Sequence, residues 1–388
     1  MGFPKTKVAF CENGAGYGGA IISLAAFLKN IPESFDTHIY TCLGTEEYQR
    51  LSELGRWRHL APVSLINSDL WKARGVPFVS MLDNICNVAP YAMRFYSAFR
   101  KDGIKIAYLN NDPSCNLAAA MAASLAGIPM VLHARGFSSA TRSAQWVLSK
   151  ITHCIAVSNA VRDQLVASGV RPDKCTVVHE GLDMTLFRPR PPSESVRREL
   201  GIGDDEPVVT LVGGLVDWKG QDVLLDACPR IFSAFPTAHV LLVGAAYGKD
   251  NGYANMILAK ANAPEFKGRV RALGSRQDIP DILSISSVVV HASTKPEPFG
   301  RTFLEGMAMG KPVIASAEGG PCEVIEHNRD GMLVQPREPA RLAQAICRLL
   351  SEADFAASLA KNAVAKAARY SIENHSMEIE KVLKRFSA

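Results

Sequence analysis

Short apolar runs alternate with amphipathic, helix-forming segments along most of this 388-residue chain. Runs of this kind are typical of strands buried on both faces, and the segments between them are typical of helices that cover a sheet. Because strands separated by helices lie parallel, the first half of the chain predicts a parallel α/β sheet. We predict its strands at 8–11, 37–41, 104–109, 130–133, 153–157 and 176–178, and its helices near 19–28, 90–101, 114–126, 142–150 and 159–168.

A proline-rich and then charged stretch at 188–206 interrupts the alternation. Such a composition is typical of a connection between domains. The strand and helix pattern restarts after it, with strands predicted at 208–212, 240–243, 270–273, 288–291 and 313–315.

The length of the chain suggests two domains of ordinary size rather than one. Each half of the pattern is that of a Rossmann-like sheet, which binds its ligands at the carboxyl ends of the strands. We therefore predict an N-terminal Rossmann-like domain over 1–187, a linker over 188–206, a second Rossmann-like domain over 207–370 and a C-terminal helix over 371–388.

Composition narrows the class of protein only a little. The chain is 47% hydrophobic and 21% charged, as is ordinary for a globular protein. Its nine cysteines are scattered and odd in number, so we expect neither a disulfide framework nor a zinc site, and we expect a reducing compartment such as the cytoplasm. We expect no secretion signal and no membrane span, and the net charge of +5 permits contact with an anionic membrane or substrate.

The stretch 294–312 carries the most specific candidate chemistry. Pro296 and Pro298 keep the chain extended, Gly300 permits a sharp turn, and a short helix is predicted over 301–309. The first N–H groups of such a helix have no intrahelical partner, and the helix dipole favours negative charge there. The stretch therefore predicts an anion site at the start of this helix.

Two carboxylates flank the predicted anion site, Glu297 before the helix and Glu305 within it. A phosphate at the helix start with a carboxylate on each side suits a nucleotide-sugar, whose hydroxyls need acceptors at both ends. The plainer alternatives are a charge in a loop for Glu297 and an acid on a solvated helix face for Glu305.

Further blocks along the chain carry a family resemblance. In the second half they are Val-Gly-Gly-Leu-Val-Asp-Trp-Lys-Gly at 212–220, 242–244, 273–279, Glu-Pro-Phe-Gly at 297–300 with Glu305, 310–315, 319–323 and 331–334. In the first half they are Gly18-Gly19, His133, 157–159, Glu180-Gly-Leu-Asp and Phe187. Together the blocks resemble the retaining glycosyltransferases of family 4, which have the GT-B fold and a Glu-x7-Glu motif.

The resemblance implies two Rossmann-like domains that face each other across a cleft, with a C-terminal helix that crosses back to the N-terminal domain. It implies a hexosyltransferase that moves a sugar from a nucleoside-diphosphate sugar to a glycan or lipid-linked acceptor with retention, as in cell-surface polysaccharide biosynthesis. The sequence offers no Asp-x-Asp of the kind that holds a metal on a diphosphate, so we expect no metal and no cofactor apart from the nucleotide-sugar co-substrate.

The same resemblance implies roles for residues of the second half. Glu297 would contact hydroxyls of the donor sugar beside its anomeric carbon, and Glu305 would accept hydrogen bonds from the ribose. Lys219 would pair with the diphosphate, although an ordinary exposed lysine is the alternative. The amides that would hold the diphosphate are those of Phe299, Gly300, Arg301 and Thr302.

One expected phosphate ligand is missing, because family members usually have an arginine where this chain has Gly214. Arg135, Arg276 and Arg301 are the candidates to replace it, and the sequence does not choose among them.

In the first half, the resemblance implies that Gly18 and Gly19 let a glycine-rich loop approach the donor diphosphate and the acceptor. A tight turn is the alternative for this loop, which also contains Gly14 and Gly16. His133 would lie near the donor sugar as a catalytic residue, and a core histidine is the alternative. Glu180 stands where the family commonly has asparagine.

Residues 56–101 are the candidate acceptor region. They mix aromatic and basic side chains, which suits a peripheral contact with the inner face of a membrane that carries a lipid-linked acceptor. The alternative is a solvated basic helix face whose aromatic side chains lie in the core. We expect no nucleic-acid partner. The residues that carry the mixture are 56–59, 70–74, Tyr91, Arg94, Phe95, Phe99, Arg100 and Lys101.

Two other functions fit the same residues. One is a GT-B nucleotide-sugar 2-epimerase, which would release nucleotide without an acceptor. The other is a catalytically silent glycan-binding subunit, which would bind nucleotide without turnover.

Overall fold

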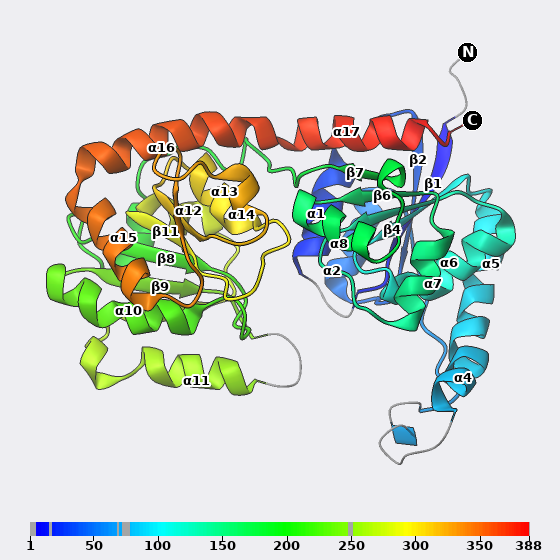
Figure 1. Ribbon diagram of the computed structural model, residues 1–388, viewed down its shortest axis with the longest axis horizontal. Helices are drawn as coiled ribbons and strands as arrows, with labels where there is room; N and C mark the ends of the chain where they lie inside the picture. The colour runs from blue at the N-terminus through cyan, green and yellow to red at the C-terminus, as the bar shows by residue number, and fades with distance from the viewer. Residues whose placement is uncertain (1–4, 15–17, 68–69, 72–77, 247–250, 388) are drawn as a thin grey trace. The chain divides into compact units, whose positions relative to one another are not determined.

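The computed structural model describes residues 5–14, 18–67, 70–71, 78–246 and 251–387. The chain forms two compact units (Figure 1). The first unit consists of Met1–Gly181 together with Ile372–Ala388, and the second consists of Leu182–Ser371.

The first unit is built on a seven-stranded parallel sheet with the strand order β3-β2-β1-β4-β5-β6-β7. The order reverses between β1 and β4, and this is the kind of position at which α/β sheets bind ligands. The strands are β1 (Thr6–Glu12), β2 (Phe35–Thr41), β3 (Arg56–His59), β4 (Ile106–Asn110), β5 (Met130–Ala134), β6 (His153–Ala156) and β7 (Cys175–Val177).

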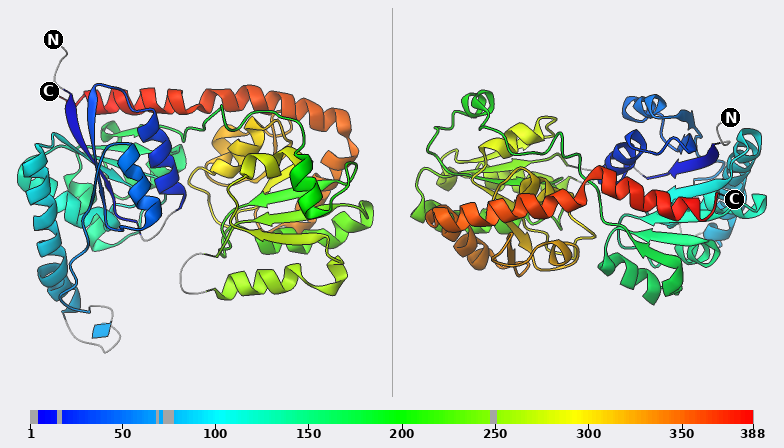
Figure 2. Two further views of the ribbon diagram at one scale, coloured as in Figure 1. Left: turned by 180° about the vertical axis from the view of Figure 1, so that it is seen from behind. Right: turned by 90° about the horizontal axis from the view of Figure 1, so that it is seen from above.

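Helices cover both faces of this sheet. One face is covered by α1 (Gly19–Lys29) and the last helix, α17 (Ile372–Lys384) (Figure 2). Apolar side chains of these helices, such as Leu24 and Ile379, pack onto the strands. On the other face, aromatic side chains of α5 contact Tyr40 of β2. The further helices of this unit are α2 (Glu46–Gln49), α4 (Val79–Asp83), α5 (Ala89–Asp102), α6 (Leu117–Ala126), α7 (Arg142–Lys150) and α8 (Asn159–Ala167).

The second unit has a six-stranded parallel sheet with the order β10-β9-β8-β11-β12-β13. Helices α10 and α15 pack over one face of it and α9 and α12 over the other. The strands are β8 (Val208–Val212), β9 (His239–Val243), β10 (Val270–Gly274), β11 (Val288–His291), β12 (Val313–Ser316) and β13 (Met332–Val334). The helices are α9 (Glu194–Leu200), α10 (Gln221–Ala234), α11 (Gly252–Ala261), α12 (Ile279–Ile285), α13 (Arg301–Ala308), α14 (Pro321–Val324), α15 (Pro339–Ser351) and α16 (Ala353–Ala367).

The predicted fold class of two parallel Rossmann-like sheets is confirmed. Two edge strands were not predicted. β3 has the sequence Arg-Trp-Arg-His and is only partly buried, so it lacks the apolar run of an interior strand. β13 has only three residues.

The predicted linker over 188–206 does not stand apart from the domains, and this prediction needs correction. Helix α9 lies inside it and places Val196 and Leu200 in a buried cluster with Val208 of β8 and Leu241 of β9. Charged residues on the outer side of α9 dominate the composition of this stretch, so its composition alone does not reveal the apolar face of the helix.

Within the described part of the chain, no helix is both long and apolar enough to cross a membrane.

Candidate active site

The predicted anion site lies at the carboxyl edge of the second sheet, where β11 leads through a loop into α13. Gly300 caps α13 with a φ of 95°, which favours glycine because a side chain is strained in this region. The loop before it is held from behind by a second segment. Gly320 donates its N–H to the carbonyl of Glu297 at 2.8 Å, and Glu297 and Gly319 form a parallel bridge.

Two glycines make this close contact with the loop feasible. A Cβ on Gly319 would lie 2.2 Å from the Glu297 carbonyl oxygen, and one on Gly320 would lie 2.4 Å from the Phe299 backbone. The Gly-Gly pair at 319–320 therefore lets this segment pack against the loop backbone, and this packing fixes the position of Glu297 relative to the start of α13.

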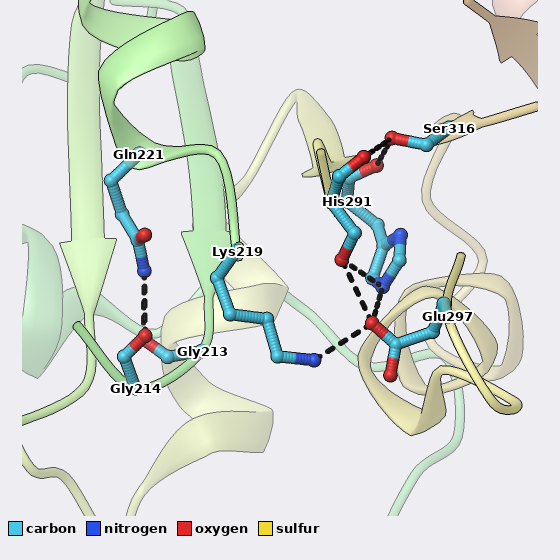
Figure 3. A network of polar contacts seen from close by, with 8 residues as sticks. Gly213, Gly214, Lys219, Gln221, His291, Glu297 and Ser316 are labelled. Carbon is cyan, nitrogen blue, oxygen red and sulfur yellow. Dashed lines mark hydrogen bonds and ion pairs between the residues drawn. The ribbon is translucent and has the colours of Figure 1, made fainter. Parts of the chain in front are cut away.

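Glu297 is 6% exposed, and the hydrogen bonds that its carboxylate makes with described residues all go to one of its two oxygens (Figure 3). Oε2 accepts from Lys219 Nζ at 2.8 Å and from Ser293 Oγ at 2.8 Å, and it lies 3.0 Å from His291 Nε2. The other oxygen, Oε1, points away from this cluster (Figure 3). Glu297 is therefore held in one orientation with an oxygen left for another group.

The charge of Glu297 is fixed as well as its position. Burial alone would raise the pKa of this carboxyl, but the Lys219 ammonium and the hydrogen bond from His291 outweigh burial and hold the pKa well below its ordinary value. Glu297 is therefore a carboxylate at neutral pH, and it is not the solvated loop charge that the sequence left open.

Lys219 reaches Glu297 from the turn between β8 and α10. Gly220 has a φ of 71°, and a Cβ there would lie 1.9 Å from the carbonyl oxygen of Ala292, so the two segments touch through their backbones. The buried amide of Gln221 donates to the carbonyl of Gly214 at 2.9 Å and holds the preceding glycine turn (Figure 3). The block 212–220 therefore serves to bring a lysine to the end of β11.

Glu305 lies one turn into α13 and is 8% exposed. Burial raises the pKa of its carboxyl, and Arg301, whose Nη2 lies 3.6 Å from Oε1, acts against that shift. Glu305 is thus not an acid on a solvated helix face. Phe299 is buried, and its ring lies 6.0 Å from that of Phe303 on α13.

The three arginines proposed to replace the one missing at Gly214 have different surroundings. Arg276 donates to both oxygens of Glu199 and to Asp278. Arg135 is buried in the first unit. Arg301 lies at the start of α13 next to Glu305 and is the candidate that shares the site.

Sequence reasoning missed His291, Ser293 and Gln221. His291 ends β11, Ser293 follows it by two positions, and Gln221 begins α10. A polar residue directly after an apolar run of a parallel sheet was the available signal, because such residues line the ligand edge.

In the first unit, Gly18 and Gly19 begin α1. Gly18 is extended, with a φ of −148°, and no described atom lies within 4 Å of a Cβ added to either residue. Neither the backbone nor the described neighbours require glycine at these positions. Gly14 is restricted, because its Cβ would lie 2.7 Å from Glu12 Oε1, and Gly16 is outside the described residues.

His133 lies in the interior of the first unit, which is the alternative that the sequence left open. Its side chain is fully buried, Nδ1 is hydrogen-bonded to the Tyr108 hydroxyl, and its ring lies 5.8 Å from that of His375 on α17. Burial, with Arg135 and His375 nearby, lowers the pKa of His133 well below its ordinary value, so the ring is neutral.

At the carboxyl ends of β1, β4 and β5, buried polar side chains are linked by a series of hydrogen bonds. Arg135 donates from Nε to Asn110 at 2.6 Å and from Nη1 to Glu180 at 2.7 Å. Asn110 in turn donates to Glu12, which accepts the N–H of Gly14 at 2.9 Å. The glutamate at 180 therefore has a structural partner in Arg135.

Solved structures share this architecture over the whole chain. A crystal structure of Anabaena Alr3699/HepE in complex with UDP and glucose is 25% identical with a TM-score of 0.82, and the match covers 98% of this chain and 99% of that one. A glycosyltransferase from Rickettsia africae ESF-5 is 21% identical with a TM-score of 0.82, and it shares the fold over 99% of both chains. The fold is therefore that of the GT-B glycosyltransferases.

Family models identify the family to which the chain belongs. Residues 17–186 match the model of Glycosyltransferase Family 4, and residues 192–366 match that of Glycosyl transferases group 1. The chain belongs to the glycosyltransferases that combine these two domains.

Curated relatives match more locally. A D-inositol 3-phosphate glycosyltransferase of Acidothermus cellulolyticus is 31% identical over 224 residues, which are 53% of this chain and 47% of the relative. Spore coat protein SA of Bacillus subtilis is 32% identical over 199 residues, 48% of this chain and 52% of the relative. The chain spans about half the length of the curated relatives it matches.

Proposed function

We propose that this protein transfers a hexose from a nucleoside-diphosphate sugar to a glycan or lipid-linked acceptor, with retention of configuration, as in cell-surface polysaccharide biosynthesis. One observation carries the proposal. Glu297 is a buried carboxylate, kept ionised by Lys219 and fixed directly before the N-terminus of α13. A carboxylate oxygen that accepts hydrogen bonds, placed next to an anion site, suits a molecule that has hydroxyls beside a phosphate.

The donor that the relatives support is a uridine diphosphate sugar. Anabaena Alr3699/HepE was crystallised with UDP, with UDP and glucose, and with UDP-glucose. UDP-glucose is therefore the first donor to test.

The proposed binding mode follows the charges of the second unit. The diphosphate lies against the N–H groups between Phe299 and Thr302, where the dipole of α13 favours an anion. Lys219 turns its ammonium from Glu297 to the diphosphate when the donor binds. Glu297 Oε1 then accepts from a sugar hydroxyl, and Glu305 accepts from the ribose.

In the proposed step, the acceptor oxygen forms a bond to the anomeric carbon on the face from which the diphosphate departs. The bond between that carbon and the phosphate oxygen breaks, the electron pair goes to the diphosphate, and a phosphate oxygen takes the acceptor's proton. Lys219 and the α13 amides stabilise the negative charge of the leaving group, so the proposed step uses neither a metal ion nor a cofactor.

Gly18 and Gly19 support the proposal that the first unit contributes to substrate binding. They begin a helix, and no described atom within 4 Å and no positive φ requires glycine there. Because glycine has no side chain, such a helix start suits close approach of a substrate. His133 has no part in the proposed step, because its ring is enclosed by Tyr108 and His375.

Turnover of UDP-glucose with a lipid-linked or soluble glycan acceptor tests the proposal. We expect Glu297→Gln to lower the rate of transfer by about 10²–10³ or more while the fold persists, because an oriented charge at the reacting carbon is lost. Glu265→Gln, an exposed position of the same unit, should retain the wild-type rate.

Other outcomes favour other functions. Release of UDP from donor alone, with a changed sugar and no acceptor, identifies a 2-epimerase. Binding of UDP by calorimetry without turnover on any acceptor identifies a silent glycan-binding subunit. A wild-type rate in Glu297→Gln contradicts the site.

A further inference from the structure

The acceptor region of the first unit separates its aromatic and basic side chains. Tyr91, Phe95 and Phe99 of α5 are buried and pack against each other, and Phe95 and Phe99 also pack against Tyr40. The α5 aromatics of the predicted membrane contact therefore belong to the core, and residues 72–74 of that prediction lie outside the described residues. The cations of α5 remain on its outer side.

A groove runs along this outer side. It has a volume of about 460 Å³ and is open to solvent. Its lining combines three cations with four apolar side chains, namely Arg58, Arg94 and Lys101 with Leu60, Pro90, Met93 and Ala98. An anionic group with an adjoining apolar part fits such a lining.

Two of these cations have no carboxylate partner among the described residues. Arg58 is paired with Asp102 at 3.2 Å, so its charge is partly neutralised. Arg94 donates to the carbonyl of Ala61 at 2.8 Å, and its charge and that of Lys101 are left to attract an anion.

An exposed apolar edge follows α4, the helical turn over 84–88 and the start of α5, where Met93 also lines the groove. Figure 1 shows α4 extending from α5 away from the sheet of the first unit, and Figure 2 shows the same from behind. Met81, Ile85 and Met93 are 56%, 59% and 50% exposed. Exposed apolar side chains that adjoin cations on one helical arm are typical of segments that lie in a membrane interface.

We propose that this face, composed of the groove and of Met81 and Ile85, binds the surface of an anionic bilayer. A headgroup phosphate lies in the groove between Arg94 and Lys101, and the apolar side chains enter the acyl boundary. Charge complementarity favours this occupant over a neutral surface, and the apolar edge favours it over a nucleic acid. The inference rests on the proposed function in one respect, because a lipid-linked acceptor has to be met at a bilayer.

The test is flotation of the full chain with vesicles, without donor or acceptor. Its failure therefore leaves the transferase proposal untouched. We expect binding to vesicles of phosphatidylglycerol and phosphatidylcholine and little binding to phosphatidylcholine alone. A basic residue near such a surface changes the partition coefficient by about fivefold, so Arg94→Gln with Lys101→Gln should lower it by about 25-fold.

A matched pair of exposed cations on the second unit provides the control. Arg341→Gln with Lys361→Gln makes the same change in net charge and should bind as the wild type does. Met93→Gln with Ile85→Gln removes apolar surface and should lower binding by about tenfold. Melting curves check that each variant is folded.

Three results would overturn the proposal. One is that the wild type binds neither kind of vesicle. Another is that Arg94→Gln with Lys101→Gln binds like its control. The third is self-association without lipid that the Met93 and Ile85 variant abolishes, which would make the face an interface between two copies of the chain.

Discussion

At the scale of single residues, the candidate site is defined by what surrounds each carboxylate. Glu297 and Glu305 are both buried, yet the pKa of Glu297 is held low and that of Glu305 is raised. Lys219 and the hydrogen bond from His291 outweigh burial for Glu297, whereas Arg301 at 3.6 Å only opposes it for Glu305. The pKa values of two acids eight positions apart therefore shift in opposite directions, and the Lys219 ammonium, which comes from a distant part of the sequence, is a main reason.

The depressed pKa of Glu297 makes a prediction about stability and pH. Because its pKa is lower in the folded chain than the ordinary value of 4.5, this carboxylate stabilises the fold above about pH 4.5 and ceases to do so as pH falls further. We expect Glu297→Gln to lower the free energy of unfolding by roughly 1–3 kcal/mol near neutral pH, and the difference from wild type to shrink below about pH 4.5.

Urea unfolding across this pH range, followed by circular dichroism, measures the effect. The exposed Glu265→Gln should stay within about 0.5 kcal/mol of wild type throughout. A difference for Glu297→Gln that does not depend on pH would contradict the assigned charge.

At the scale of elements, the site depends on two turns that hold one loop. Gly220 lets the turn before α10 touch the end of β11, and Gly320 lets the segment after β12 support Glu297 and Phe299 from behind. The carboxylate and the start of α13 therefore have a fixed geometry before any donor binds.

Gly320→Ala tests this support. The φ of Gly320 is −53°, which any residue adopts, so the cost of alanine is the clash of its Cβ with the Phe299 backbone at 2.4 Å. We expect a loss of roughly 1–3 kcal/mol in unfolding free energy, from overpacking, and at least about a tenfold loss in affinity for UDP. Denaturation and calorimetry measure the two.

Gly203→Ala is the control, because the nearest atoms to its Cβ belong to the flexible Glu206 side chain at 3.4 Å. It should change neither quantity noticeably. Unchanged affinity for UDP in a folded Gly320→Ala would show that the loop position does not matter for the donor.

At the scale of the whole molecule, the last helix of the chain forms part of the core of the first unit. Helix α17 contributes Ile379, Val382 and Leu383 to the core of the first unit, next to α1. The first unit is therefore discontinuous in sequence, and it needs the last helix to bury the apolar surface of its sheet.

We expect Ile379→Ala to destabilise the first unit by about 2–5 kcal/mol, because the residue is fully buried and a cavity would remain. Met377→Ala on the same helix is the control, since Met377 is 50% exposed. Hydrogen exchange measured by mass spectrometry separates the units, and faster exchange is expected in β4 and β5 but not in β8 and β9. Equal acceleration in both sheets would contradict the division.

The sequence by itself determined the two parallel sheets, because strands buried on both faces need uninterrupted apolar runs, and β8 and β11 are read from such runs without error. It also determined the loop that leads into α13 and the start of that helix, because proline and glycine restrict the backbone locally. Only the tertiary structure decided that α9 belongs to the second core and that Lys219 meets Glu297. These outcomes depend on which segments distant in the chain come to lie together, and burial and charge act between such segments without leaving a local pattern.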